Sequence, residues 1–341
     1  MAHIKTWVVI GIFSLGILLG IEGLLIYGFN YRELVEGDLD CKVYNENAGF
    51  SHYRPNCKLT SKNWEQDSAV SYEFNSFGRR EPDQPVADIN VAFFGDSFTM
   101  GAMVPIEKNY NFKALEKFET PRYRGHNFGV AAAQFHNILA QLNFTDTNEF
   151  DLIIYGLTPN DFFNIVDGTD PFIREKPVSK KVVVNQSTTS SLKNLILSSA
   201  TSRFLLHNLM KIDSVYLQTY KARKPYAGYL DSPLPSPFSF AVDHVLLALN
   251  SLDNSKRDKL IVFLLPQRAE VVAAKLGQIN NPLRDYFISK CREMNFECAS
   301  ADVIKLSKVP ESHYPVDGHL TISGNASVAE DLFIVMSNWL D

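Results

Sequence analysis

The longest run of hydrophobic positions lies near the beginning of the chain, from Trp7 to Phe29, and contains one charged residue, Glu22. At about 1.5 Å per residue, a helix of this length can cross a hydrocarbon layer of roughly 30 Å. A cleaved signal peptide is the alternative, but its apolar region is usually shorter, and no small-x-small cleavage site is evident. The pattern therefore predicts one N-terminal transmembrane helix as a membrane anchor within residues 1–30.

The basic residues around this segment do not decide which side of the membrane the rest of the chain occupies. Lys5 precedes the segment, whereas Arg32 and Lys42 follow it, and this difference is too small to set an orientation. A single N-terminal span followed by a large polar region usually leaves that region outside the cytoplasm. We therefore expect a single-pass membrane protein with a periplasmic or other extracytoplasmic domain.

Beyond residue 84, short apolar runs alternate with stretches of helical periodicity. Apolar runs closed by a glycine or proline are typical of buried parallel strands. The alternation predicts an α/β fold in which helices cover both faces of a parallel sheet. The expected strands are 90–94, 124–128, 151–155 and 260–265, and the expected helices are 110–118, 131–143, 191–222, 241–252, 268–276, 282–294 and 322–340.

The chain divides into the anchor (1–30), a polar juxtamembrane lead with short strands (31–84) and a main domain (85–341). Within the main domain, residues from about 168 to 240 contain proline, lysine and serine clusters and form an insertion. Insertions at the carboxyl edge of a sheet shape the pocket, so we expect this one to govern substrate choice. Its tyrosines could stack on sugars or pack on helices, and packing is favoured; they are Tyr216, Tyr220, Tyr226 and Tyr229.

Composition narrows the classes of function. The chain has 341 residues, 45% of them hydrophobic, as in ordinary globular proteins. A net charge of −5 argues against a nucleic-acid binder, which would present a basic face. The cysteines form two pairs that are close in sequence, which allows two local disulfides or four free buried thiols. Neither spacing matches a zinc or thioredoxin-type motif; the pairs are Cys41 with Cys57 and Cys291 with Cys298.

The first candidate for chemistry is Ser97, in the stretch GDSFTMG directly after the first strand of the main domain. Active sites of parallel sheets lie beyond the carboxyl ends of the strands, where a turn can expose a serine as a nucleophile. The alternative is that Asp96 and Ser97 only cap the next helix. A phosphate-binding loop is disfavoured, because its lysine and its glycine spacing are missing.

Two further strand ends offer donors for an oxyanion. Gly129 follows the second strand and Asn160 follows the third. A backbone N–H of Gly129 and the side-chain amide of Asn160 could stabilise the negative charge that develops on a carbonyl oxygen, together with the N–H of Ser97. We expect these three residues to form an oxyanion hole.

The general base is expected near the end of the chain. Asp317 and His319 lie on an irregular stretch before the last helix. His319 can take the hydroxyl proton of Ser97, and Asp317 can orient the imidazole and fix its tautomer. His313 is the weaker candidate for this role.

In order and spacing over roughly residues 85–340, these blocks resemble the SGNH/GDSL hydrolase superfamily. The matching positions are Ser97, Gly129, Asn160, Asp317 and His319. The resemblance implies a three-layer α/β/α sandwich with a flavodoxin-like parallel sheet. It also implies ester hydrolysis or acyl transfer through an acyl-serine intermediate, with no metal or other cofactor.

The departures from the family pattern resemble a membrane-anchored branch that handles O-acetylation of envelope polysaccharides. Asn160 lies two residues farther from Gly156 than in a G-x-N-D block, and the last block is Asp-x-His instead of Asp-x-x-His. NSFGRR at residues 75–80 also resembles the N-S-x-G-x-R element of anchored relatives. The implied substrate is an ester such as an acylated glycan, with hydrolase and transferase both open. The alternative is a catalytically silent binding or assembly protein of an envelope-modifying complex.

Overall fold

The computed structural model describes residues 14, 16–25, 33–38, 40–84, 86–118, 122–169, 199–222, 226–278 and 280–340. Most of the expected transmembrane segment lies outside these residues, as does the part of the expected insertion over residues 170–198. Residues 16–23, which are described, are helical. Within the described part of the chain, no helix has the length and apolar character needed to cross a membrane.

The centre of the molecule is a five-stranded parallel sheet with the order β10-β9-β8-β6-β7. Counted along the chain, this is the 2-1-3-4-5 order of flavodoxin-like sheets. The four strands expected from the sequence are present, and the three-residue β10 is an addition. The strands are β6 (Ile89–Gly95), β7 (Tyr123–Asn127), β8 (Leu152–Leu157), β9 (Leu260–Leu264) and β10 (Cys298–Ser300).

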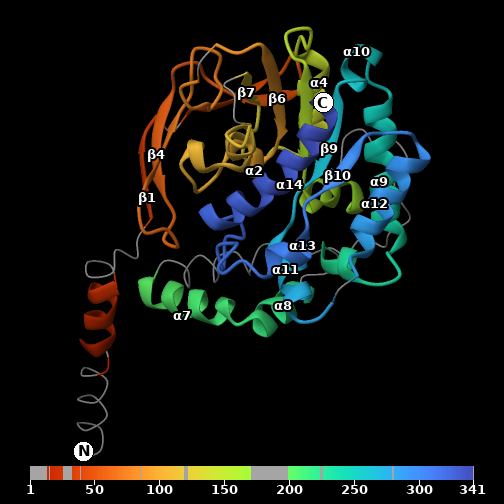
Figure 1. The fold of residues 1–341 in the computed structure, drawn as a ribbon. Helices are drawn as coiled ribbons and strands as arrows, with labels where there is room; N and C mark the ends of the chain where they lie inside the picture. Colours follow the sequence, from red (N-terminus) through yellow and green to blue (C-terminus); the bar gives the residue numbers. More distant parts are fainter. Residues whose placement is uncertain are drawn as a thin grey trace, which may run out of the picture.

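Helices cover both faces of this sheet and form the expected three layers (Figure 1). Successive side chains of β6 enter opposite cores, with Ala92 and Phe94 on one face and Val91 and Phe93 on the other. The first core is closed by α4 (Phe135–Phe144), α5 (Phe163–Val166), α9 (Ser236–Asn250) and α12 (Pro282–Glu293). The second is closed by α3 (Tyr110–Leu115), α13 (Val303–Ser307) and α14 (Ile322–Leu340).

The helix α9 begins five residues earlier than the periodicity predicts, inside a proline-rich stretch that reads as irregular. Pro237 lies in its first turn, where the missing N–H has no helical partner in any case. The remaining helical elements are short or lie at the carboxyl edge of the sheet. They are α2 (Ser97–Met100), η2 (Ile106–Lys108), η3 (Pro159–Phe162), α7 (Ala200–Lys211), α8 (Asp213–Lys221), η4 (Tyr226–Leu230), α10 (Asn254–Arg257) and α11 (Arg268–Lys275).

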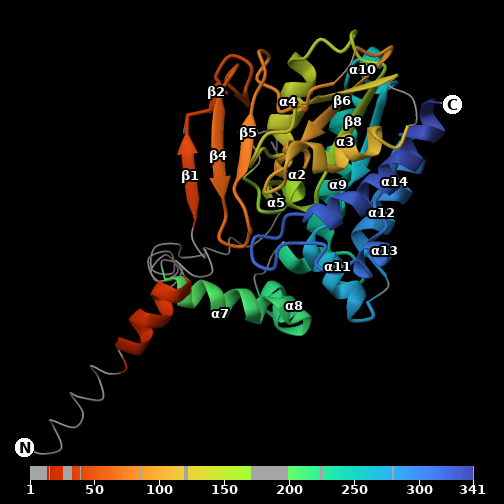
Figure 2. The same cartoon turned by 60° about the vertical axis from the view of Figure 1, so that its left-hand side comes forward.

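The lead folds into a small antiparallel unit against one edge of the main domain (Figure 2). Its strands are β1 (Leu34–Gly37), β4 (Lys58–Lys62) and β5 (Val70–Glu73), with a hairpin of β2 (Lys42–Asn45) and β3 (Phe50–Tyr53). Tyr53, Tyr72 and Phe74 share one hydrophobic cluster with the central sheet. The lead therefore packs as part of the same core.

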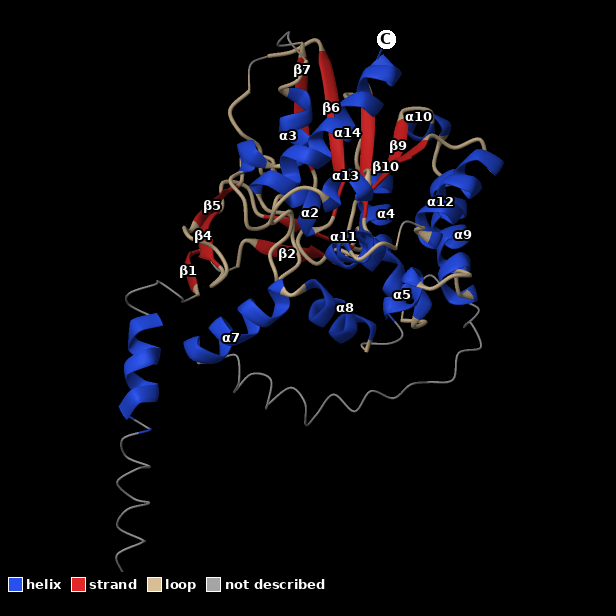
Figure 3. Ribbon diagram, turned by 60° about the horizontal axis from the view of Figure 1, so that its bottom comes forward, coloured by secondary structure: helices blue, strands red, loops and turns tan. Residues whose placement is uncertain are grey.

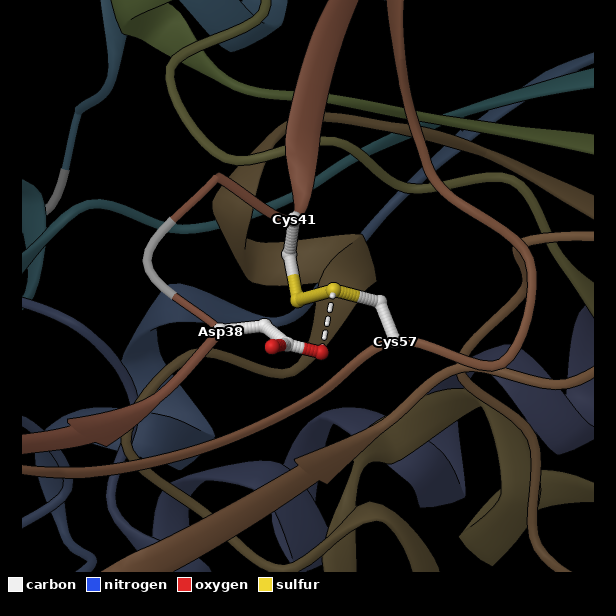
Figure 4. A group of neighbouring side chains, drawn as sticks. All are labelled: Asp38, Cys41 and Cys57. Carbon is white, nitrogen blue, oxygen red and sulfur yellow. Dashed lines mark hydrogen bonds between the residues drawn. A yellow bond between two sulfur atoms is a disulfide. The ribbon is translucent and has the colours of Figure 1, made fainter.

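Both cysteine pairs form disulfides, Cys41 with Cys57 and Cys291 with Cys298. The first bridge ties the start of β2 to the residue before β4 (Figure 4). The carboxylate of Asp38 lies 3.6 Å from the sulfur of Cys57. Because both sulfurs are in the disulfide, this group of three residues offers no thiolate to a metal ion.

Candidate active site

Ser97 lies where β6 turns into the short helix α2, at the carboxyl edge of the sheet. Asp96 is the N-cap of this helix, since its carboxylate accepts a hydrogen bond of 2.9 Å from the N–H of Phe98. The capping interpretation therefore holds for Asp96 but not for Ser97. The hydroxyl of Ser97 is left to face the loop at the other end of the chain.

The loop before α14 brings His319 to this hydroxyl. The Nε2 atom of His319 lies 2.7 Å from the Oγ atom of Ser97. The Nδ1 atom of the same ring hydrogen-bonds to the Oδ1 atom of Asp317, which also accepts the backbone N–H of His319 at 3.2 Å. The ring of Phe98 packs against the imidazole, with centroids 4.9 Å apart. Nucleophile, base and orienting carboxylate thus form one continuous chain.

The charges around His319 favour its protonated form. Burial alone would lower the pKa of His319, but the hydrogen bond and charge of Asp317, with the charges of Asp96 and Glu65, raise it above its ordinary value of 6.5. Burial also opposes ionisation of Asp317, and the bonds and charge of His319 outweigh it, so the pKa of Asp317 is lowered. An imidazolium formed during a proton transfer is stabilised at this position.

His313 is a structural histidine in this fold. Its side chain is buried, Nδ1 pairs with the hydroxyl of Ser312 at 3.1 Å, and Nε2 lies 3.5 Å from the carbonyl of Pro266. Burial lowers the pKa of His313 to about 3. The ring of His313 thus bonds to Ser312 and Pro266, whereas Ser97 bonds to His319; His313 also pairs with Leu320 in an isolated antiparallel bridge.

Asn160 lies beside Ser97, and both residues line the same cavity. Its Nδ2 atom donates to the buried carboxylate of Asp96 at 3.1 Å, and its Oδ1 atom accepts from Nε2 of Gln267 at 2.8 Å. An amide NH₂ carries two protons, so one N–H remains available to the cavity that Asn160 and Ser97 line together. The N–H of Ser97, in the first turn of α2, has no partner within that helix.

Gly129, the third residue expected in the oxyanion hole, lies apart from this arrangement. Its N–H donates to the side-chain oxygen of Asn127 at 2.9 Å, and it does not line the cavity of Ser97. A Cβ atom at this position would lie 2.2 Å from the backbone nitrogen of Met100. Glycine is needed here for the close approach of the chain to α2.

Asp161 holds the loop that carries Asn160. Its Oδ2 atom accepts the N–H of Thr158 at 2.9 Å, and the hydroxyl of Thr158 bonds to Asp96 at 3.0 Å. Burial raises the pKa of Asp96 and that of Asp161, and the charge of Asp96 raises the pKa of Asp161 further. The two carboxyl groups therefore favour a state with a single negative charge, which the donors around Asp96 stabilise.

Sequence reasoning missed the residues of the lead that hold the catalytic loop. Glu65, between β4 and β5, has a fully buried side chain and accepts the N–H groups of Val316 at 2.8 Å and Asp317 at 2.6 Å. Asn63 donates to the second oxygen of Asp317 at 3.4 Å. No pattern around Glu65 distinguishes it from other acidic residues, since its partners lie about 250 residues away in sequence.

Arg80 explains the NSFGRR element that the sequence singles out. Its buried guanidinium donates to the carbonyls of Met100, Gly101, Val104 and Ser71. It thereby fixes the segment after α2.

The cavity beside Ser97 has a volume of about 320 Å³. Figure 3 shows α7, α8 and α11 gathered near this end of the sheet. Tyr216 lies under the guanidinium of Arg268 at 3.8 Å, and the hydroxyl of Tyr220 bonds to Gln267 at 3.3 Å. Both tyrosines pack as expected and line the cavity as well. Tyr229 is fully buried beneath them, and the side chain of Tyr226 is outside the described residues.

No protein-family model matches the chain, and no curated protein matches it. Similar solved structures include a member of the lipolytic protein G-D-S-L family from Veillonella parvula DSM 2008, with a TM-score of 0.40 and 10% identity over 73% of this chain and 98% of that one.

Two further matches are of the same kind. A putative lipolytic protein of the G-D-S-L family from Desulfitobacterium hafniense DCB-2 has a TM-score of 0.38 at 10% identity, over 72% of this chain and 98% of its own. The lipase/acylhydrolase from Enterococcus faecalis has a TM-score of 0.36 at 12% identity, over 73% of this chain and 94% of its own.

Proposed function

We propose that the protein is a serine-dependent ester hydrolase or O-acyltransferase that works through an acyl-serine intermediate. The observation that carries the proposal is the chain from Ser97 Oγ to His319 Nε2, at 2.7 Å, and from His319 Nδ1 to Asp317. This is the connectivity of nucleophile, base and orienting acid in serine hydrolases. It opens into a cavity large enough for a small ester.

The reaction follows from the positions of these groups. His319 takes the proton of Ser97 as the oxygen attacks the ester carbonyl, and Asp317 stabilises the imidazolium. The oxyanion is held by the N–H of Ser97 and the free N–H of Asn160. His319 then gives its proton to the departing alcohol. Water or the hydroxyl of an acceptor, deprotonated by the same imidazole, releases the acyl group from Ser97.

Membrane anchoring through residues 7–29, an extracytoplasmic domain and an acylated glycan as substrate are part of the same proposal. The anchor is supported by the length and apolar character of the segment. The location is supported by two disulfides, which persist in oxidising compartments. The glycan is supported by the Asp-x-His block and the NSFGRR element.

The test uses the full chain in detergent with p-nitrophenyl acetate and longer esters, beside Ser97→Ala and a fluorophosphonate probe. We expect turnover and labelling of the wild type, with both lost in Ser97→Ala. An acetylated oligosaccharide with and without an acceptor sugar then separates hydrolysis from transfer. An inert wild type whose Ser97 also resists the probe would favour the catalytically silent binding protein.

A further inference from the structure

The helix α7 exposes an unusual apolar face. Leu205, Leu209 and Ile212, the last of them at the end of the helix, are 56%, 50% and 50% exposed. At 3.6 residues per turn, these three side chains fall within an arc of about 60°. A helix that faces water normally presents polar residues over such an arc. A contiguous apolar face of this kind indicates an interaction surface.

The opposite face of α7 is firmly held, so the helix is fixed in its orientation. Leu206 and Met210 line the cavity of Ser97, and the imidazole of His207 lies 3.3 Å from the buried carboxylate of Glu65. The carbonyl of Met210 also accepts a hydrogen bond from Arg268. One side of α7 thus lines the cavity of Ser97, and the opposite side carries the exposed apolar face.

The N-terminus of α7 is joined to the N-terminal helix through Glu22. The carboxylate of Glu22 accepts the N–H groups of Ala200 and Thr201, at 2.5 Å and 2.9 Å, and the hydroxyls of Ser199 and Thr201. It therefore satisfies helix-terminal donors from outside the helix. The one charge in the apolar segment has a full set of polar partners.

The two helices present apolar side chains on both sides of this junction. The described part of the N-terminal helix runs away from the domain, and α7 lies crosswise near its end in both views (Figures 1 and 2). The exposed apolar residues of the N-terminal helix are Ile17, Leu18, Leu19, Ile21 and Leu24. The apolar surface of the N-terminal helix belongs to the segment that the sequence predicts to be in the bilayer. The apolar face of α7 lies next to the point where that segment would leave the bilayer.

We propose that α7 is an interfacial helix whose face of Leu205, Leu209 and Ile212 lies in the surface of a lipid bilayer. The inference rests on the membrane anchor proposed above. A carboxylate with four donors belongs at the depth of the headgroups and not in hydrocarbon, so the proposed anchor crosses the hydrocarbon with the residues that precede Glu22. Because Glu22 fixes the start of α7 at that depth, the apolar face of the helix meets the boundary between headgroups and acyl chains.

This placement narrows the class of substrate. The cavity of Ser97 lies on the inner face of α7, about one helix diameter, roughly 10 Å, from the bilayer surface. Esters or acceptors that are held at the membrane surface can therefore reach Ser97 while they stay bound to the membrane. The expected substrates are surface-bound, with an apolar part that follows α7.

The test places a fluorophore on this face in the full chain, reconstituted in vesicles of phosphatidylcholine and phosphatidylglycerol. All four cysteines are in disulfides, so Leu209→Cys introduces one free thiol for an NBD label. The matched control is Leu247→Cys, a leucine of α9 that is 61% exposed. We expect a blue-shifted NBD spectrum at residue 209, quenched by lipids with a nitroxide near the headgroup, and neither effect at residue 247.

Three results would overturn the inference. A label at residue 209 that is as aqueous as the one at residue 247 means that no bilayer covers α7. A blue-shifted label that lipid nitroxides do not quench means that protein covers the face, either another part of this chain or a second copy. A chain that fails to float with the vesicles removes the anchor itself, and esterase assays in detergent show separately whether the proposed chemistry survives.

A functional measurement adds a second readout. Leu209→Glu places a charge on the bilayer face without touching the cavity. We expect it to lower turnover of an ester embedded in vesicles and to leave turnover of soluble p-nitrophenyl acetate unchanged, whereas Leu247→Glu changes neither. Equal activity of Leu209→Glu and wild type on the embedded ester contradicts the proposal.

Discussion

Two regions of the molecule meet at the candidate active site and contribute in different ways. The carboxyl edge of the parallel sheet supplies Ser97 and Asn160, which face the cavity. The antiparallel lead supplies Glu65 and Arg80, whose side chains bind backbone groups of the loops that carry or flank the site. One region offers reacting groups, and the other fixes where they lie.

The lead is more than a spacer in front of the main domain. Glu65 accepts two consecutive N–H groups of the loop that carries Asp317. Precise placement of a base is worth large factors in rate. Changes at the sheet edge should therefore abolish chemistry, while changes in the lead should degrade its geometry.

The largest effect is expected at the nucleophile. Ser97→Ala and His319→Ala should each lower kcat on p-nitrophenyl acetate by about 10⁴-fold or more, because each removes a member of a unit that acts together. The double variant should be no worse than either single one. Thermal melts of the variants serve as the control for folding. Additive losses in the double variant would contradict a shared catalytic unit.

The second prediction concerns Asp317 and pH. His319 acts as a base only when neutral, and its raised pKa means that kcat/KM falls as the pH drops through a value above 6.5. Asp317→Asn removes the negative charge that favours the imidazolium. It should lower kcat by about 10⁴-fold and move the acid limb to lower pH. An acid limb of the kcat/KM profile that does not move in Asp317→Asn would show that a group other than His319 titrates there.

The third prediction tests whether Asn160 donates a hydrogen bond to the oxyanion. Asn160→Ala should lower kcat by about 10²–10³-fold, because one oxyanion donor is lost, with a smaller change in KM. Asn164→Ala, on the adjacent α5, is the matched control and should retain activity. Equal activity of Asn160→Ala and wild type would show that Asn160 only structures the loop.

The fourth prediction tests the positioning role of the lead. Glu65→Gln should lower kcat by about tenfold to 10²-fold, since one carboxylate oxygen that accepts an N–H is replaced by an amide nitrogen. Loss of its charge should also move the acid limb of the rate profile to lower pH, because Glu65 helps to raise the pKa of His319. Glu36→Gln on the exposed β1 is the control. A purely structural role would leave the pH profile unchanged.

The smallest effect on chemistry is expected at Arg80. Arg80→Lys keeps the charge but cannot reach all four carbonyls, and each buried acceptor left without a donor costs about 1–3 kcal/mol. We expect a lower melting temperature, with kcat per folded molecule changed little. Arg54→Lys, at an exposed position, should melt as the wild type does. An unchanged melting temperature of Arg80→Lys would show that the hydrogen bonds of Arg80 to these carbonyls are not needed for stability.

Local sequence was sufficient for the sheet and for most of the site. Buried strands such as 151–155 and 260–265 are apolar throughout, and strand ends are where catalytic residues of parallel sheets lie. The GDS and Asp-x-His blocks were therefore found as candidates, and the structure brings Ser97, Asp317 and His319 together. For Gly129 the sequence cannot separate two roles, because a glycine required for close packing looks the same in sequence as one that donates to an oxyanion.

By itself, the sequence determined the periodicities, the order of the strands along the chain and the residue types at their ends, since these follow from local burial and turn geometry. Only the tertiary structure decided that Glu65 binds the backbone of the loop that carries Asp317. The same is true of the hydrogen bonds of Asn160 to Asp96 and Gln267, and of Glu22 to the start of α7. These contacts join residues far apart in the chain. Their partners are chosen by three-dimensional packing, which no local pattern records.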